Sequence, residues 1–588
     1  MHPLACRVEA SASASGDPDD RRRSPIHHPE VHMHARQFRF ALLALLSAAA
    51  GCADDLPTQP DIAPPAGASL NTLEPYAGKI RVGIIPAATS VKIGATVAYD
   101  VREKGTNAYL VSGLAGEQAT VTWNQSVGVA TNNRRLQVVC TTTAADRDQR
   151  VTAGTAAGFP SAWEYVSTAS CWRVYIGERP LPMDTTAERI YKQNVINAGL
   201  ATTSALWKTV NTTVYEPRYV TTKTTGTSAI SRAQPRITVA STARVTIGTA
   251  QYRGIAEVMK NAAGTLAGIN EVGMEEYLYG VVPRELGPSV YPEMEAQKAQ
   301  AVAARTYAHS SLGKHWNNGY DVLATVQDQV YGGSAAEHSI STSAINATAG
   351  IVATYNGAMI SALFYATSGG KTSNVEDVFA TTAPYLRTVW DAPAGQELPS
   401  VSALLTDLRT PTWTGAYGGF HSYHRWNYSW TMAQMSCVVG DFANKPVGNV
   451  NAINILARSS TSGRVTQIEF VTDQGTFTET GTAIRSAMPY ISSSGVPTML
   501  PSTLFVIERV TNSSGALTGY RAYGGGNGHG AGLAQTGAVG MARAGHTYDQ
   551  ILKKYYTGIA LQVMNGTRRN GTSPNPTTTT DPYDCTAA

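Results

Sequence analysis

Apolar residues recur at helical spacing in two stretches between residues 275 and 309, and a break separates them. The first stretch carries these apolar residues on one face: Leu278, Val281 and Val282. Pro283 has no N–H to continue a helix, so the first helix is predicted to end at Val282. The second helix is predicted to begin at Pro292 and to end near Gly313. Small and aromatic residues line one of its sides: Ala296, Ala299, Ala303 and Tyr307. The pattern therefore predicts a helix, a broken elbow and a second helix.

Glu285 lies in the elbow between the two predicted helices, next to Val282 and Leu286. A carboxyl group that apolar neighbours partly remove from water has a raised pKa, and it can then act as an acid. A solvated glutamate near a helix end fits the same pattern, and because most glutamates are exposed, spacing alone favours that interpretation. The helical pattern turns the neighbouring Glu275 and Glu276 toward solvent or a helix end.

The rest of the chain has the mixed pattern of an α+β fold. Short β-branched runs separated by turn residues predict strands between residues 79 and 173 and between residues 236 and 273, with a helix at 187–200. A shift toward Trp, Tyr, Pro and Gly after residue 390 predicts an inserted loop region. The chain is therefore divided into a leader with a signal (1–52), a flexible tether (53–78), a β-rich accessory domain (79–235), a larger domain (236–561) and a disordered tail (562–588). The larger domain has a helical core and strands, and it contains Glu285 and an insertion (390–460).

The amino terminus has the layout of a secretory signal. A basic stretch from Met33 to Arg39 leads into an apolar run at residues 40–50, which ends in Gly51 and Cys52. The run is too short to cross a bilayer, and the small residues before Cys52 resemble a bacterial lipobox. We expect translation from Met33, lipid attachment at Cys52 and an exported lipoprotein anchored in a membrane of the cell envelope. A plain cleaved signal with an incidental cysteine is the alternative.

Charge and cysteine usage narrow the function. The formal net charge of +4, without a basic patch interleaved with aromatic residues, argues against nucleic acid as a partner. Cys140 and Cys171 both lie in the first mature domain, and an exported protein permits a disulfide between them. The chain has neither a CxxC pair nor an HExxH pattern, so no metal and no other cofactor is expected.

Five ordered blocks of the sequence resemble the SpoIID/LytB family, the sporulation protein D and amidase-enhancer group. The blocks are EEYLYGVVPREL with EAQKAQAVAARTYA, DQVYGG (328–333), ATSGGKTSNVEDVF (366–379), PYL (384–386) and GNGHGAGLAQTGAVGMARAGHTYDQILKKYYTG (526–558). Characterised members are lytic transglycosylases that cut peptidoglycan glycan strands, and their catalytic acid is the glutamate of the GVV-x-x-E motif. The resemblance therefore implies that Glu285 is the catalytic acid. Zinc-binding members carry cysteines before QVY, and this chain has none there.

The accessory domain carries a second, fainter resemblance. The stretch from Cys171 to Leu200 resembles the strand–helix unit of SPOR-type glycan-binding modules. A β-rich linker domain without a ligand has the same pattern, so both interpretations stay open.

The SpoIID-like blocks also contain candidate substrate-binding residues: Gln300, Arg305, Ser368, Gly369, Gly370, His529 and Gln535. Gln300 and Arg305 lie on the alanine-rich helix, where they either face Glu285 and bind sugar or tie the helix to a neighbouring strand. The run from Ser368 to Gly370 is expected to offer open backbone to a polysaccharide. His529 and Gln535 match the family's GHG-x-G-x-x-Q motif, and a ligand contact and a structural role are equally open for them.

Two functions from different classes follow. In the first, the protein is a lytic transglycosylase that cleaves the bond between N-acetylmuramic acid (MurNAc) and N-acetylglucosamine (GlcNAc) in peptidoglycan glycan strands and forms 1,6-anhydro-MurNAc ends. In the second, it is a catalytically silent wall-binding protein of the amidase-enhancer type that acts with other wall hydrolases such as amidases. The presence of Glu285 in its elbow favours the enzyme. Glycosidases commonly use two carboxylates, and three acids are candidates for a second one: Asp321, Asp328 and Glu376.

Overall fold

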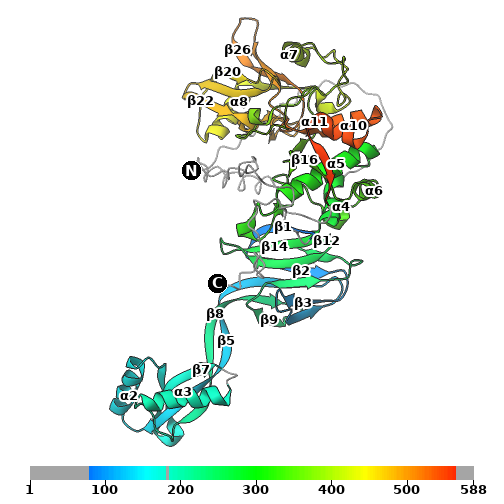
Figure 1. Cartoon of the computed structure of the whole chain (residues 1–588). Helices are drawn as coiled ribbons and strands as arrows, with labels where there is room; N and C mark the ends of the chain where they lie inside the picture. The colour runs from blue at the N-terminus through cyan, green and yellow to red at the C-terminus, as the bar shows by residue number, and fades with distance from the viewer. Residues whose placement is uncertain (1–77, 181–183, 565–588) are drawn as a thin grey trace, which may run out of the picture.

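The protein has an α+β fold, as the sequence predicts. The computed structural model describes residues 78–180 and 184–564, so Cys52, nearly all of the predicted tether and most of the predicted tail lie outside the described residues. The tail predicted to be disordered from residue 562 is wrong at its start, because residues 562 and 563 end a strand, β28 (Ala560–Val563). Figure 1 shows an elongated arrangement: a β-rich body in the middle, a helical region and an upper lobe on one side, and a distal lobe at the end of a two-stranded arm on the other. Within the described ranges, no helix has both the length and the apolar character needed to cross a membrane.

The β-rich body consists of two sheets that share one apolar core. One sheet has the order β15-β1-β14-β13-β10-β3-β4, and the other has the order β12-β11-β2-β5-β7-β6, with β8 pairing with β5 and β9. The body strands are β1 (Lys79–Ala88), β2 (Ser90–Ala95), β3 (Tyr99–Glu103), β4 (Tyr109–Gly113), β9 (Ser228–Ser231), β10 (Pro235–Thr238), β11 (Val245–Ile247), β12 (Ala250–Tyr252), β13 (Ile255–Lys260), β14 (Leu266–Gly273) and β15 (Val322–Leu323). Val91 and Ile93 of β2 are buried in this core while Lys92 between them is exposed, which is the period expected of a strand with one buried face. The expected domain boundary between residues 235 and 236 falls inside β10, a strand of the first sheet.

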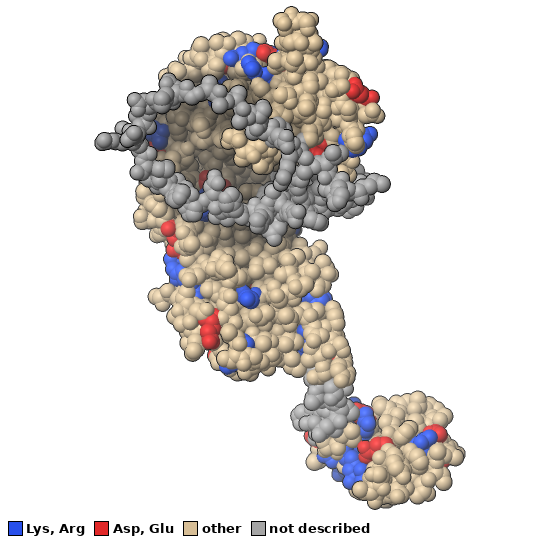
Figure 2. All heavy atoms as spheres, turned by 180° about the vertical axis from the view of Figure 1, so that it is seen from behind, with Lys and Arg blue, Asp and Glu red and all other residues tan. Residues whose placement is uncertain are grey.

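Two long strands leave the body and form the arm that carries the distal lobe. These strands, β5 (Gln118–Thr141) and β8 (Leu206–Thr222), pair antiparallel along most of their length. The lobe contains α2 (Ala144–Ala156), β6 (Ser161–Val166), β7 (Cys171–Pro180) and α3 (Thr185–Asn197). A disulfide joins Cys140 to Cys171 with their Cα atoms 5.6 Å apart, which confirms the predicted pairing. Seen from behind, basic and acidic side chains gather on this lobe (Figure 2).

The helical region is built around α5 (Met294–Ser310), which packs against helices on several sides. Its other elements are α4 (Met274–Glu285), α6 (Ser339–Ala347), α10 (Gln535–Arg543), α11 (Tyr548–Tyr555), β16 (Ile351–Tyr355), β17 (Ala358–Met359), β18 (Phe364–Tyr365), β27 (Leu533–Ala534) and β28 (Ala560–Val563). The predicted helix pair is confirmed, but the predicted end of the first helix at Val282 is wrong, because α4 continues through Pro283. Pro283 costs the helix one hydrogen bond, because it lacks an N–H, but it lies in the last turn and does not stop the residues after it from bonding. The N–H of Leu286 still donates to the Val282 carbonyl at 2.9 Å.

The upper lobe has its own apolar core. Its elements are α7 (Val401–Arg409), β19 (Trp426–Thr431), α8 (Met432–Ala443), β20 (Val450–Arg458), β21 (Val465–Thr472), β22 (Gly475–Thr480), α9 (Ile484–Ala487), β23 (Tyr490–Ile491), β24 (Pro497–Thr498), β25 (Phe505–Thr511) and β26 (Leu517–Gly524). The expected loop insertion at residues 390–460 therefore contains helices and strands. Its aromatic residues are core residues: Trp426 and Trp430 are buried together with Met435 and Val450.

Candidate functional site

The candidate site lies where α4 ends and where the loop of residues 328–333 packs against that helix. Gly280 makes the close approach possible, because a Cβ atom there would lie 2.6 Å from the Tyr331 ring and 3.0 Å from the Gly333 carbonyl oxygen. The N–H of Gly332 donates to the Gly280 carbonyl at 3.0 Å and ties the loop to the helix. Two of the sequence blocks, EEYLYGVVPREL and DQVYGG, are thereby brought together.

Glu285 is the last residue of α4, and its carboxyl group contacts this loop. The N–H of Val330 donates to Oε1 at 2.8 Å, whereas Oε2 accepts no hydrogen bond from a described residue and is not sealed from solvent. The side chain is half-buried, with Val282 and Leu286 buried on either side. Burial raises the pKa of Glu285 above the ordinary glutamate value, and the hydrogen bond from Val330 offsets part of that rise. The site therefore holds a partly desolvated carboxyl group with one oxygen available for proton exchange.

A buried glutamine that the sequence analysis missed fixes the elbow after Glu285. Gln297 of α5 donates from Nε2 to the carbonyls of Leu286 at 2.8 Å and Tyr291 at 2.9 Å. Its Oε1 accepts from Ser341 Oγ at 2.7 Å. A fully buried amide with all of its polar groups bonded holds its partners in one geometry. The sequence signal that could have identified Gln297 is its place as a polar residue in an alanine-rich helix.

Asp328, two residues before Val330, is a carboxylate that remains ionised. It accepts hydrogen bonds of 2.6–3.0 Å from Lys314, His315, the Tyr307 hydroxyl and the Leu323 N–H. Burial by itself would raise the pKa of Asp328, but these donors outweigh burial and hold that pKa well below its usual range. Asp328 therefore cannot supply a proton near neutral pH.

The other two candidates for a second carboxylate are also held by partners of their own. Asp321 is fully buried and accepts from the backbone N–H groups of Arg81 at 2.9 Å and Gly313 at 2.8 Å. Glu376 forms a two-pronged ion pair with Arg387, at 2.6 and 2.5 Å, and this pairing lowers its pKa. The pKa of Glu285 is thus raised, whereas the pKa values of Asp328 and Glu376 are lowered.

Gln300 and Arg305 do not line an open groove. Arg305 is fully buried and forms a two-pronged ion pair with Glu275, at 2.8 and 2.6 Å, and it also donates to the carbonyls of Ile345 and Ile351. It therefore ties α5 to α4, α6 and β16, which is the structural alternative of the two considered. Glu275, expected to face solvent or a helix end, is its partner. Gln300 is buried, and its Oε1 accepts from Gln535 Nε2 at 3.3 Å, so the two glutamines join α5 to α10.

The run from Ser368 to Gly370 is not the open backbone that was expected. Ser368 is fully buried. A Cβ atom at Gly369 would lie 2.5 Å from the carbonyl carbon of Gly525, and one at Gly370 would collide with the Trp413 ring. Both glycines have positive φ angles, +74° and +110°, which favour glycine. Protein atoms therefore occupy the space that was assigned to a polysaccharide.

A buried acid beside this run was also missed. Asp391 is fully buried and accepts hydrogen bonds from Ser368 Oγ at 2.5 Å and from the Tyr555 hydroxyl at 2.6 Å. Burial raises the pKa of Asp391 to about 6, although both hydrogen bonds act in the opposite direction. No local sequence pattern marked this residue, because its partners lie 23 and 164 positions away.

His529 has a structural role in this geometry. Its Nε2 donates to the Phe364 carbonyl at 3.0 Å, and its Nδ1 accepts from the Ala531 N–H at 3.2 Å. Burial lowers the pKa of His529 to about 4, so the ring is neutral near pH 7. Gln535 is buried as well, and its Nε2 donates to Gln300. Among the described residues, no cluster of three or more His, Cys, Asp or Glu side chains could hold a metal ion.

Fold and site together define an α+β protein in which one protonatable glutamate at the junction of two helices is the candidate for acid–base chemistry. The chain belongs to the SpoIID/LytB family. The family model for Stage II sporulation protein matches residues 262–355, the segment that contains Glu285, Gln297 and Val330. Residues 373–532 match a domain of unknown function, DUF8618.

Three relatives show how far the similarity extends. An uncharacterized protein of Brachyspira hyodysenteriae is 33% identical over 303 residues, which cover 51% of this chain and 70% of that protein. Stage II sporulation protein D of Bacillus subtilis is 28% identical over 308 residues, covering 50% of this chain and 75% of that protein. The amidase enhancer of Bacillus subtilis is 29% identical over 299 residues, covering 48% of this chain and 40% of that protein. The similarity to each of these relatives thus involves about half of the chain.

Proposed function

We propose that this protein acts at the bacterial cell wall as a lytic transglycosylase that cuts peptidoglycan glycan strands. The single observation that carries the proposal is the state of Glu285: its carboxyl group has a raised pKa, one oxygen fixed by Val330 and the other in reach of solvent. The names of the relatives, Stage II sporulation protein D and amidase enhancer, support a role at the wall.

One carboxyl group suffices for the proposed reaction. Protonated Glu285 gives its proton from Oε2 to the GlcNAc O4 as the bond between that oxygen and MurNAc C1 breaks. The N-acetyl group of MurNAc assists at C1. The ionised Glu285 then takes the proton of the MurNAc C6 hydroxyl while O6 bonds to C1, which closes the 1,6-anhydro ring and restores the acid. No water is consumed. The Val330 N–H stabilises the carboxylate that exists between the two proton transfers.

The test replaces Glu285 with glutamine, which keeps the size of the side chain but cannot donate or recover the proton. Digests of purified sacculi are analysed by mass spectrometry for 1,6-anhydro-MurNAc ends. Glu285→Gln should lower their release by at least about a hundredfold, the usual contribution of a positioned acid–base group. The rate of the wild type should fall as pH rises through the raised pKa of Glu285, because the first step needs the protonated form.

A matched control lies on the same helix. Glu276 is 37% exposed, and its nearest cation, Arg253, is 3.8 Å away, so Glu276→Gln should leave the rate nearly unchanged. Wild-type turnover in Glu285→Gln, or a wild type that releases only reducing-end hydrolysis products, contradicts the proposal. A wild type that binds glycan and releases nothing supports the second candidate, a silent wall-binding protein, which the similarity to the amidase enhancer favours.

The proposal places the protein outside the cytoplasm, where peptidoglycan lies. The disulfide between Cys140 and Cys171 supports export, because such bonds persist in oxidising compartments. Cys52, outside the described residues, is proposed as the site of lipid attachment.

A further inference from the structure

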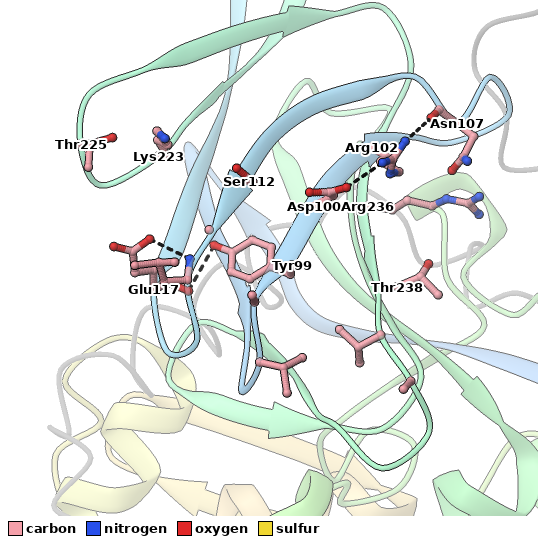
Figure 3. Close-up of a pocket in the computed structure, with 16 residues that line it drawn as sticks. Tyr99, Asp100, Arg102, Asn107, Ser112, Glu117, Lys223, Thr225, Arg236 and Thr238 are labelled. Atoms are coloured by element: carbon pink, nitrogen blue, oxygen red, sulfur yellow. Dashed lines mark hydrogen bonds and ion pairs between the residues drawn. The ribbon is translucent and has the colours of Figure 1, made fainter.

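A cavity of about 890 Å³ lies in the β-rich body, at the root of the arm (Figure 3). It is bordered by the β3–β4 hairpin, the turn before β5, the β8–β9 turn and β10. None of its lining residues belongs to the candidate site around Glu285. Its volume is in the range of small-ligand sites, ~300–1,000 Å³, which is large enough for a disaccharide or a short peptide.

One end of the cavity has an arginine without a counter-ion. Arg102 of β3 and Arg236 of β10 lie directly opposite each other in the ladder, and like charges in this position destabilise a sheet. Asp100 compensates Arg102 through an ion pair of 2.6 Å. The guanidinium of Arg236, by contrast, makes no hydrogen bond or ion pair with any described residue.

The acid nearest to Arg236 along the sheet is already engaged. Glu257 of β13 is the ladder neighbour of Arg236 on its other side. Its carboxylate is buried and pairs with Arg81 at 2.7 Å and Lys104 at 3.0 Å. Arg236, which lines the cavity, thus forms no ion pair with an acid on either neighbouring strand.

The opposite end of the cavity carries Lys223. Figure 3 shows Lys223 on one side, Arg102 and Arg236 on the other, and the Tyr99 ring between them. The ammonium group of Lys223 has no partner among the described residues. Glu117, the acid at this end, accepts from the Leu114 N–H at 2.9 Å and forms no ion pair with Lys223. The cavity thus has, at each end, a cation that forms no ion pair with a described residue.

We propose that this cavity binds an extended wall fragment that carries oxyanions at two points, one held by Lys223 and the other by Arg236. Two wall sources have this chemistry: the carboxylates of a muropeptide, and the phosphodiesters of an anionic wall polymer. The choice of wall fragments rests on the proposed function, whereas the two-ended anion site rests on the cavity itself.

The experiment is calorimetric titration of the full exported chain with two probes. One is a disaccharide-tetrapeptide (GlcNAc–MurNAc-peptide), compared with its amidated form, and the other is a glycerol-phosphate oligomer. The first probe contains no MurNAc–GlcNAc linkage to cut, so its binding is measured independently of the proposed reaction. We expect one probe to bind, added salt to weaken it, and Lys223→Gln and Arg236→Gln each to weaken it by about tenfold, the factor given by ~1.4 kcal/mol.

Lys92→Gln is the matched control, because Lys92 is exposed on β2 outside the cavity and should leave the affinity unchanged. If Lys223→Gln, Arg236→Gln and amidation of the probe each weaken binding of the tetrapeptide probe, the ligand is a muropeptide. If the two substitutions weaken binding of the glycerol-phosphate probe instead, the ligand is an anionic wall polymer. Failure of both probes to bind, or wild-type affinity in both cavity variants, overturns the proposal. Binding that persists when no 1,6-anhydro product is found contradicts the proposed function alone.

Discussion

The ion pair between Glu275 and Arg305 should contribute strongly to the stability of the helix pair, and removal of the Glu275 charge tests this role. The Arg305 side chain is fully buried, whereas the side chain of its partner Glu275 is 31% exposed. Glu275→Gln keeps the shape but leaves the guanidinium without its counter-charge. Loss of one partner from a buried pair costs ~3–5 kcal/mol, and the partial exposure of Glu275 places this case near the lower end, at about 3 kcal/mol. Urea-unfolding curves should show this loss in the free energy of unfolding.

The control and the counter-test use neighbouring positions. Glu276→Gln, one residue further along α4, removes an equal charge from the pair of Glu276 with Arg253, whose charged atoms are 3.8 Å apart. This change should lower the free energy of unfolding by less than about 1 kcal/mol. Arg305→Lys should also lower stability, because lysine cannot form the two-pronged pair. If Glu275→Gln unfolds like Glu276→Gln, or if Arg305→Lys raises KM without loss of stability, the structural role assigned to Arg305 is wrong.

Two further predictions concern other sites. Burial raises the pKa of Asp391 to about 6, so its contribution to stability is present below the ordinary value near pH 4 and is lost as pH rises through 6. The free energy of unfolding of the wild type minus that of Asp391→Asn should fall by about 2 kcal/mol between pH 4 and pH 7, and a flat difference contradicts the assignment. Lipid attachment at Cys52 predicts that Cys52→Ser loses both an acyl mass and membrane association, and retention of both refutes it.

The parts of the site that were predictable depend on residues close in sequence. The helix pair follows from apolar spacing on either side of the elbow. For Glu285, the neighbours Val282 and Leu286 made partial desolvation possible, but spacing alone favoured a solvated side chain, and the resemblance to the SpoIID/LytB family singled the residue out. The disulfide followed from two cysteines within one exported domain. These features need only local patterns or a count of residue types.

The parts that were not predictable depend on partners far along the chain. Arg305 pairs with Glu275 across 30 positions. Gly369 packs against Gly525, so a glycine run that looks open in sequence is closed by a distant backbone. The pairing of β10 with β3 is also long-range, and together with the pairing of β10 with β13 it places residues 235 and 236 within one sheet strand instead of at a domain boundary. Local periodicity carries no information on such contacts.

The environment of Glu285 balances two opposing requirements of a single acid–base group. Full burial without a donor would keep the carboxyl group protonated and make its ionised form too costly, which would block the first proton transfer. Full exposure would leave the group ionised near neutral pH, with no proton to give. Half-burial beside Val282 raises the pKa, and one backbone N–H, from Val330, limits the cost of ionisation. That N–H comes from a loop that packs against Gly280. Any side chain added at position 280 should therefore displace the loop and change the pKa of Glu285, even without a contact to the substrate.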